Sequence, residues 1–305
     1  MPASIRPFPA LLTIAVLTAL VLFADTPFTG LWAVVLSDSA HGPVCAGIAA
    51  IVFHSLRRST TQRWWIAIAA TTLLGILIEL VQGVIGRDAE AMDVLTDFLG
   101  AAAGSGLCVA FAWDSSRPQL HAGMLSAFTA TALLAVPVVS MIGAYVARST
   151  RFPVLMDGNA AFGASFITPF WTEPRQEALP PSANPRMPGE RGLRVRATPP
   201  QFWWSIALME VQHDWRPWRS LVIEVFNPRE RSIPFHVRVF DKPNGLADDS
   251  GFIAHTRLEP RARTEWKLPL RDMKQVDLSH IYGMILFTAS GDPDDDIYFL
   301  QMRLE

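Results

Sequence analysis

The chain has 305 residues, of which 50% are hydrophobic and 18% are charged, with a formal net charge of −2. A charge this close to zero says little about partners, but the lack of a basic stripe along the chain disfavours a nucleic-acid-binding protein. The length suffices for two domains. Charged residues are few and clustered up to about residue 146, and they become frequent, together with prolines, from residue 147 onward. We therefore predict a membrane domain over 1–146 and a soluble domain over 147–305.

Apolar runs divide the first domain into five segments, each close to the ~20 residues that a helix needs to cross ~30 Å of hydrocarbon. They are residues 8–24, 41–56, 64–85, 92–113 and 124–146. The second run is short for a span, and Pro137 is expected to kink the fifth. Arg6 before the first run would also suit a signal peptide, but no small-residue cleavage site follows before Asp25, which favours an uncleaved helix.

The short loops predict the orientation, because arginine and lysine accumulate on the cytoplasmic side of a membrane. Arg6 precedes the first run, the second loop contains Arg57, Arg58 and Arg63, and the first loop contains no arginine or lysine. We expect a multi-pass protein of the cytoplasmic membrane with a cytoplasmic N-terminus. After five crossings, the second domain would be extracytoplasmic.

Polar residues interrupt the third and fourth runs where these two helices would form one hairpin. Glu79 and Gln82 are three residues apart, and Asp93 and Asp97 are four apart, so each pair shares a helix face. An unpaired charge at the depth of Glu79 would cost a few kcal/mol, so these groups are expected to cluster. The expected members are Asp38, His41, Glu79, Gln82, Arg87, Asp93 and Asp97. Such a cluster is either a polar clamp that fixes helix register or a site that binds or transforms a ligand.

This pattern resembles the VanZ-like membrane proteins, a family named for a teicoplanin-resistance determinant. The resemblance covers residues 8–146 and includes ELVQ at 79–82, Gly86 and Arg87, the two aspartates, and Gly100 and Gly104. It implies that Glu79, Gln82, Arg87 and Asp93 occupy the family's polar positions, and it implies a role in the cell envelope linked to glycopeptide resistance or polysaccharide handling. Asp97 stands where the family usually has asparagine, and Ser39 where it has lysine. The cluster is therefore more negative than usual, which disfavours an anionic ligand.

Other chemistry has little support in the sequence. Cys45 and Cys108 would differ in depth by roughly 15 Å, which is beyond disulfide reach. The sequence contains no glycine-rich phosphate loop, zinc-type Cys/His spacing or serine nucleophile elbow. The carboxylates and His41 could in principle hold a divalent cation. We nevertheless expect no metal and no cofactor.

Short alternating runs separated by turn residues predict an all-β second domain, folded as a two-sheet sandwich or jelly roll. In the last run, Tyr298, Leu300, Met302 and Leu304 are expected to share one face. The seven predicted strands begin near Gly192, Phe202, Ser220, Ile233, Thr264, Tyr282 and Asp296.

The strand order resembles the galactose-binding-like sandwiches found as carbohydrate-binding modules. The resemblance covers residues 155–305 and includes HDWRPW from His213, LVIEVFNP from Leu221 and the closing YFLQMRL from Tyr298. It implies that the second domain binds a glycan. Gln301 stands where such modules often have an aspartate near a structural calcium, so no calcium is expected.

Tryptophan rings could stack on the C–H faces of sugars in this domain. The aromatic candidates are Trp171, Trp203, Trp204, Trp215, Trp218, Trp266 and Tyr282. Because adjacent residues of a strand point to opposite faces, one of Trp203 and Trp204 is expected to be exposed. We select Trp203, Trp204 and Trp215 as ligand contacts.

Three functions follow from these expectations. The first is an envelope protein that binds a membrane lipid, surface glycan or lipid-linked sugar through the polar cluster and the sandwich. The second is a membrane enzyme in which Glu79 and either Asp93 or Asp97 act as acid and base. The third is a transporter, which is disfavoured because the polar residues are confined to one end of the helices.

Overall fold

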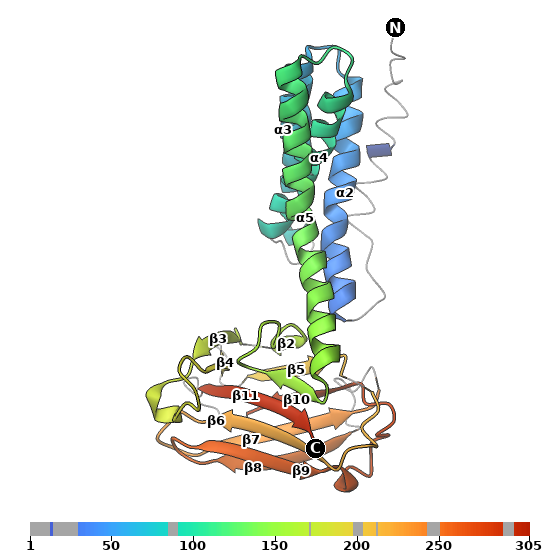
Figure 1. Cartoon of the computed structure of the whole chain (residues 1–305). Coiled ribbons are helices and arrows are strands. Elements are labelled where there is room, and N and C mark those ends of the chain that lie inside the picture. Colours follow the sequence, from blue (N-terminus) through green and yellow to red (C-terminus); the bar gives the residue numbers. More distant parts are fainter. Residues whose placement is uncertain are drawn as a thin grey trace. The chain divides into compact units, whose positions relative to one another are not determined.

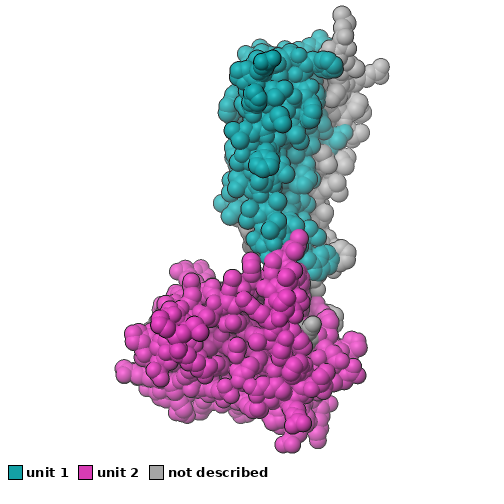
Figure 2. Space-filling view, viewed as in Figure 1, with its two compact units in different colours: residues 1–141 teal, residues 142–305 magenta. Residues whose placement is uncertain are grey.

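The computed structural model describes residues 13–14, 30–84, 91–170, 172–197, 204–211, 213–242, 251–288 and 296–305. The chain divides into two compact units, unit 1 over Met1–Met141 and unit 2 over Ile142–Glu305 (Figure 2). Apolar helices followed by an antiparallel two-sheet β domain confirm the predicted order of the two fold classes (Figure 1).

Unit 1 is built from helices α2 (Leu31–Ser55), α3 (Thr60–Val84), α4 (Ala91–Phe111) and the first part of α5 (Arg117–Arg151). All four are long and apolar enough to cross a membrane, judged on the described residues. The first predicted run, 8–24, lies outside the described residues except for Thr13 and Ile14, which are helical.

The helix α2 begins ten residues earlier than the apolar run predicted, at Leu31 instead of residue 41. Asp38 and His41 therefore lie within the helix and not before it. The hydropathy pattern missed this part because the two polar side chains lower the local average. The preceding LWAVVL segment is nevertheless apolar, and it extends the helix to 25 residues.

Small residues control how the helices of unit 1 pack. α4 packs most closely against α2 and α3. A Cβ added at Gly100 would lie 2.3 Å from the carbonyl oxygen of Gly42, and one added at Gly104 would lie 2.2 Å from that of Ala46. The α2 and α4 backbones are therefore in direct contact, as small residues permit in membrane helices.

Unit 2 contains two antiparallel sheets. One has the order β3 (Arg175–Ala178), β4 (Arg191–Arg196), β11 (Asp296–Leu304), β6 (Ser220–Phe226), β9 (Arg263–Pro269), with β1 (Val154–Asp157) also paired to β11. The other has the order β2 (Ile167–Phe170), β5 (Ser205–Met209), β10 (Gly283–Phe287), β7 (Ile233–Phe240), β8 (Phe252–Leu258). Short 3-10 helices occur at Pro181–Ala183 and Leu270–Asp272.

Aromatic rings fill the space between the two sheets. The ring of Phe299 on β11 lies 5.9 Å from the rings of both Trp204 and Phe235. Phe235, Val237 and Val239 on β7 are fully buried, as the alternating pattern predicted. Strands that are not consecutive in sequence are neighbours in both sheets, so the core is formed by segments that are distant in sequence.

A bulge in β11 corrects the predicted face of the last strand. The pairing with β6 shifts between Phe299 and Gln301. Tyr298 and Leu300 pack in a separate cluster with Leu179, Ala183 and Phe226, whereas Met302 and Leu304 follow the face of Phe299. One extra residue in a strand reverses the alternation beyond it, so a strict period of two gave the wrong face for Tyr298 and Leu300.

Candidate functional site

Polar side chains from three helices meet at one end of unit 1. α2 contributes Asp38, His41 and Cys45, spaced three and four residues apart on one face. α3 contributes Glu79 and Gln82 near its C-terminal end, and α4 contributes Asp93 and Asp97 near its N-terminal end. We call these seven residues the polar cluster. Arg87, the remaining predicted member, lies outside the described residues.

Asp97 is the most buried member of the polar cluster, with 1% of its surface exposed. Its Oδ1 accepts a hydrogen bond from the Cys45 thiol, with Sγ at 3.1 Å, and lies 3.4 Å from Nδ1 of His41. The opposite oxygen, Oδ2, is buried against Gly75, where an added Cβ would lie 2.2 Å from it. Gly75 therefore provides the space in α3 that this carboxylate occupies.

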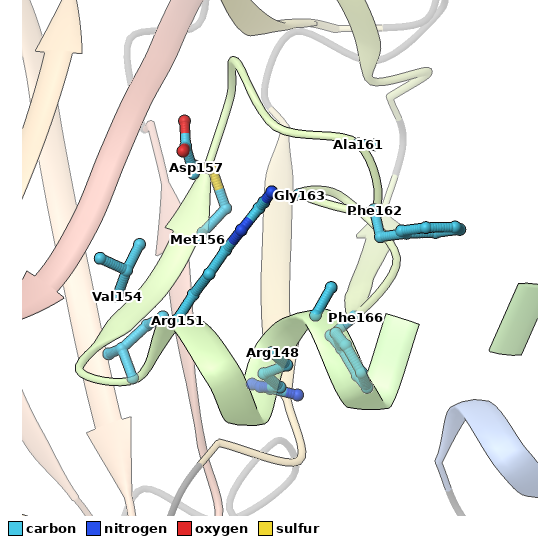
Figure 3. A pocket seen from close by; sticks show the side chains of 11 residues that line it. Arg148, Arg151, Val154, Met156, Asp157, Ala161, Phe162, Gly163 and Phe166 are labelled. Carbon is cyan, nitrogen blue, oxygen red and sulfur yellow. The ribbon is translucent and has the colours of Figure 1, made fainter. Parts of the chain in front are cut away.

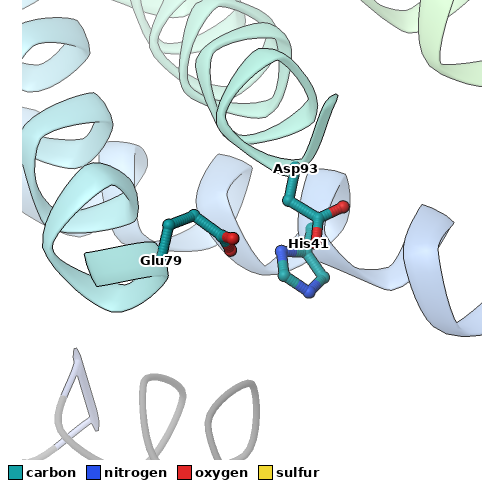
Figure 4. A group of neighbouring side chains, drawn as sticks. All are labelled: His41, Glu79 and Asp93. Carbon is teal, nitrogen blue, oxygen red and sulfur yellow. The ribbon is translucent and has the colours of Figure 1, made fainter. Parts of the chain in front are cut away.

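Glu79 and Gln82 are also buried, at 6% and 5% exposure, while His41 and Asp93 are half-buried. One ligand atom each from His41, Glu79 and Asp93 lies within 4.8 Å of the others (Figure 4). Figure 4 shows both carboxylates turned toward the imidazole ring. This arrangement can accept protons, bind a cation or accept hydrogen bonds from hydroxyl groups.

The described residues of the polar cluster are mostly acidic. They comprise four carboxylates, those of Asp38, Glu79, Asp93 and Asp97, and a single imidazole, that of His41. Helices α2 and α4 contain no arginine or lysine, and the one arginine of α3, Arg63, lies in its first turn, at the opposite end. In a medium of low dielectric constant, a buried carboxylate is costly unless a proton or a cation compensates its charge.

A pocket of about 440 Å³ lies beside the polar cluster. Its polar lining is Asp38, Ser39, Asp93 and Thr96. Its apolar lining comes from α2, α4 and α5 and consists of Val35, Met92, Leu95, Leu99, Leu133, Leu134, Val136 and Pro137. A volume in this range and a small number of polar groups in an apolar wall are typical of ligand pockets.

Two prolines leave backbone carbonyls without a helical hydrogen bond at residues that line this pocket. Pro43 in α2 has no N–H for the carbonyl of Ser39, and Pro137 in α5 has none for the carbonyl of Leu133. Ser39 and Leu133 both line the pocket. Carbonyl and carboxylate oxygens together offer acceptors, which suits a ligand rich in hydroxyl groups.

The other end of unit 1 is basic. Arg63 contacts Asp114 at 2.8 Å, and Gln119 donates a hydrogen bond to Thr61 at 2.8 Å. These contacts hold the α2–α3 and α4–α5 connections together, and the same connections contain Arg57, Arg58 and Arg117. Unit 1 therefore has a basic end and an acidic end.

In unit 2, two of the three tryptophans predicted to contact a ligand do not fit that role. Trp204 and Trp215 are both 0% exposed, because Trp204 packs on Phe299 between the sheets and Trp215 is enclosed after β5. Neither offers a ring face to a glycan, which corrects the prediction. Trp203 lies outside the described residues.

Trp218 instead lines an open groove of about 600 Å³. Its ring is half-buried and packs edge-on against Phe152, at 5.7 Å between ring centres. The groove also contains three basic side chains and one carboxylate, namely Arg219, Lys267, Arg271 and Glu305. An aromatic ring flanked by cations is suited to an anionic ligand with an apolar face.

A second, smaller pocket of unit 2 lies between the end of α5 and residues 154–166 (Figure 3). Its volume of about 30 Å³ is small enough for only about one water molecule. Arg148 beside it stacks on Phe166 at 3.9 Å and donates hydrogen bonds to the carbonyl of Met209. This cavity is therefore part of the packing and not a ligand site.

Comparisons with known proteins give likenesses at the level of structure. No protein-family model matches the sequence, so the resemblance to VanZ-like proteins stays a prediction, and no curated protein matches either. An exo-β-agarase structure has a TM-score of 0.38 and 17% identity, over 46% of this chain and 23% of the agarase chain. The chain thus spans less than a quarter of that enzyme.

Carbohydrate-binding modules are also similar. The family 11 module from Clostridium thermocellum, in complex with a β-1,3-1,4-mixed-linked tetrasaccharide, has a TM-score of 0.34 and 14% identity, over 46% of this chain and 88% of the module. A family 30 module of a cellulosomal cellulase from the same organism has a TM-score of 0.31 and 15% identity, over 45% of this chain and 92% of the module. Scores this low do not establish a shared function.

Sequence reasoning missed two residues of these sites, Cys45 and Thr96, and did not select a third, Trp218, from the aromatic candidates. Cys45 follows His41 by four residues, so the helical period could have placed it in the polar cluster. Thr96 follows Asp93 by three residues and could have been added to the pocket in the same way. Trp218 has no local signal that separates it from the buried Trp215, because the groove depends on how β6, β9 and the C-terminal residues pack.

Proposed function

We propose that this protein is a multi-pass membrane protein of the cell envelope that binds an amphiphile with a sugar-containing head group. The observation that carries the proposal is the pocket beside the polar cluster. Its oxygen acceptors suit sugar hydroxyls, and its apolar wall suits a lipid chain. A lipid-linked sugar combines both properties in one molecule.

The outer surface of unit 1 supports placement in a membrane. On α3, Leu73, Leu77 and Leu80 are each about 60% exposed. Soluble monomers rarely expose such continuous apolar faces. The basic end would be cytoplasmic, which would place the polar cluster and pocket toward the extracytoplasmic side. An odd number of crossings would also make unit 2 extracytoplasmic.

The amphiphile proposal can be tested by filling the pocket. Leu95→Trp introduces a large ring into the lining, and Leu107→Trp makes the same change on the same helix outside this pocket, at nearly equal exposure (48% and 49%). The detergent-purified full chain would be mixed with a polyprenyl diphosphate carrying N-acetylglucosamine, and bound lipid measured by native mass spectrometry. We expect binding by the wild type and Leu107→Trp, and loss in Leu95→Trp. Equal binding by both variants would contradict the proposal.

An enzymatic role for the same residues is the alternative, since buried carboxylates are suited to proton transfer. Glu79→Gln keeps the shape and hydrogen bonding of the side chain but cannot transfer a proton. Retained lipid binding and retained cellular phenotype in Glu79→Gln, with loss in Glu79→Ala, would favour binding alone. Turnover of the lipid that disappears in Glu79→Gln would favour the enzyme.

The groove around Trp218 favours a second function, recognition of an anionic glycan by unit 2. Three basic side chains stand beside the half-buried ring, and Arg271 has 87% of its side chain exposed. The wild-type chain in nanodiscs would bind polygalacturonate but not a neutral β-glucan, and binding would weaken with salt. Trp218→Ala and Arg271→Ala would each reduce binding, while Arg257→Ala, an exposed arginine on β8, would not. Equal loss with Arg257→Ala would mean that net charge alone attracts the polymer.

A further inference from the structure

We propose that unit 1 holds a divalent transition-metal ion, of the class of Zn²⁺ or Mn²⁺, between His41, Glu79 and Asp93. These residues come from α2, α3 and α4, and one ligand atom of each lies within 4.8 Å of the others (Figure 4). An imidazole and two carboxylates on three separate helices form a donor set that an ion would draw together.

The spacing is compatible with coordination after small side-chain rotations. Two donors at about 2.1 Å from one ion lie about 3.4 Å apart in tetrahedral geometry and about 4.2 Å apart in opposite positions. Donor atoms spread over at most 4.8 Å must therefore move by about an ångström or less. Carboxylates can bind through one or two oxygens, which widens the range of geometries that fit.

Asp97 gives an independent indication of a metal site. It is 1% exposed, and its Oδ1 lies 3.4 Å from Nδ1 of His41. A buried carboxylate beside a ligating histidine orients the ring and raises its basicity. Its Oδ2 receives no hydrogen bond from the residues that the structure describes. A cation nearby would compensate this buried oxygen electrostatically.

The donor set also selects the class of ion. The nitrogen donor favours a transition ion over Mg²⁺ or Ca²⁺, which prefer oxygen ligands. The Cys45 thiol is engaged with Asp97 and is not needed as a ligand.

The location of Asp93 gives the ion a possible role in ligand binding. Asp93 belongs both to the triad and to the lining of the pocket, so a coordination position not filled by protein would face that space. An ion there would strengthen the binding of a phosphate or diphosphate, which the carboxylates alone would weaken. This last step rests on the proposed function, whereas binding of the ion does not.

Ion binding can be measured with the metal alone. The full chain in detergent would be stripped with a chelator, incubated with Zn²⁺ or Mn²⁺, desalted, and analysed for metal by mass spectrometry. We expect one retained ion per chain and little retention of Mg²⁺. His41→Ala, Glu79→Gln and Asp93→Asn should each lose the ion, and Asp97→Asn should weaken binding about 10- to 100-fold by releasing the histidine ring.

A matched control is available on the same helix. His54→Ala removes an exposed histidine in the last turn of α2 and should retain the ion. Thermal melting and size-exclusion profiles would verify folding, and the near-isosteric Glu79→Gln and Asp93→Asn decide the case if His41→Ala does not fold. With bound Mn²⁺, pulsed electron paramagnetic resonance should show a nitrogen coupling that Glu79→Gln weakens. Wild-type retention equal to that of these two variants would overturn the proposal.

A second arm separates this inference from the proposed function. The polyprenyl diphosphate sugar would be added with and without the metal. Metal binding with no lipid binding would leave the metal site standing and overturn the amphiphile proposal. Lipid binding without any metal binding would leave the amphiphile proposal standing and overturn the metal site. Lipid binding that rises at least tenfold with the metal would support both.

Discussion

Both units bury carboxylates, but they compensate the charge in different ways. In unit 2, Glu224 and Asp296 are 2% and 3% exposed, and each contacts two arginines at 2.6–2.7 Å. In unit 1, Asp97 is as deeply buried, yet the polar side chains that contact it are a thiol and an imidazole. Arginine pairs complete the network of unit 2. Among the described residues, no arginine contacts Asp97 in unit 1.

This contrast separates structural from functional acids. A buried ion pair that is fully hydrogen-bonded fixes a fold and leaves no capacity for a ligand. A buried carboxylate without a strong cationic partner is costly, and it is found where binding or proton transfer occurs. We therefore expect substitutions in the network of unit 2 to change stability, and conservative substitutions in the polar cluster to change binding.

The largest effect should come from Arg263→Ala in unit 2. The guanidinium contacts Glu224 at 2.6 Å and Glu190 at 2.8 Å, so its loss leaves a buried charge with less compensation. Breaking a buried pair typically costs about 3–5 kcal/mol, and we expect about 3 kcal/mol because Arg186 still contacts Glu224. Hydrogen exchange of β6 and β9 in the full chain would measure the change.

Acid should reveal the same network. Burial raises the pKa of Glu190, but hydrogen bonds from Arg263 and the backbone of Arg186 outweigh it and hold the pKa below its ordinary value. A lowered pKa stabilises the fold above the unfolded-state value, and this contribution is lost as the pH falls through the folded-state value. Arg263→Ala should flatten this acid dependence, whereas Arg271→Ala, at an exposed position, should leave it unchanged. An equal dependence of stability on acid pH in both variants would contradict the role assigned to the Arg263–Glu190 pair.

The next effect tests how the polar cluster is held in place. Gly100→Ala would place a Cβ 2.3 Å from the carbonyl oxygen of Gly42, so α2 and α4 must separate. We expect a loss of about 1–3 kcal/mol from overpacking, with displacement of His41 relative to Asp97. Gly47→Ala on α2 is the control, because its Cβ would have no neighbour within 4 Å. The melting temperatures of the two detergent-purified variants would be compared. An equal shift in melting temperature would show that helix propensity, and not packing, determines the change in stability.

The helical periods predicted much of unit 1 from local information. Spacings of three and four residues placed Glu79 with Gln82 and Asp93 with Asp97 on shared faces, and the glycines indicated close helix contact. The Cys45–Asp97 bond joins residues 52 positions apart, so no local pattern contains it. The pocket likewise needs Pro137 from α5 beside Asp93 from α4, which only the packed bundle provides.

In unit 2, the period of two predicted the strands with strong alternation, such as β7, and missed β8 and the four-residue β1, β2 and β3. Tryptophan burial was the main error. Alternation says that neighbouring side chains point to opposite faces, but the partner sheet decides which face is covered. Trp204 is buried because Phe299 from β11 packs on it, and Phe299 is distant in sequence.

The smallest effect tests whether titratable groups outside the arginine network also contribute to the stability of unit 2. His236 on β7 stands opposite His255 on β8 and stacks on Phe287 of β10 at 4.9 Å. Burial lowers the pKa of His236, and the neighbouring His255 lowers it further. The unfolded chain therefore takes up a proton at higher pH than the folded chain. The contribution of His236 to stability is fully present above about pH 6.5 and is lost as the pH drops below that value.

His236→Gln should reduce this loss of stability, measured as the melting temperature from pH 7.5 to 5. His280→Gln is the control and should not reduce it, because the side chain of His280 is 79% exposed. A pH dependence unchanged in His236→Gln would mean that the network of carboxylates and arginines alone sets the pH response of unit 2.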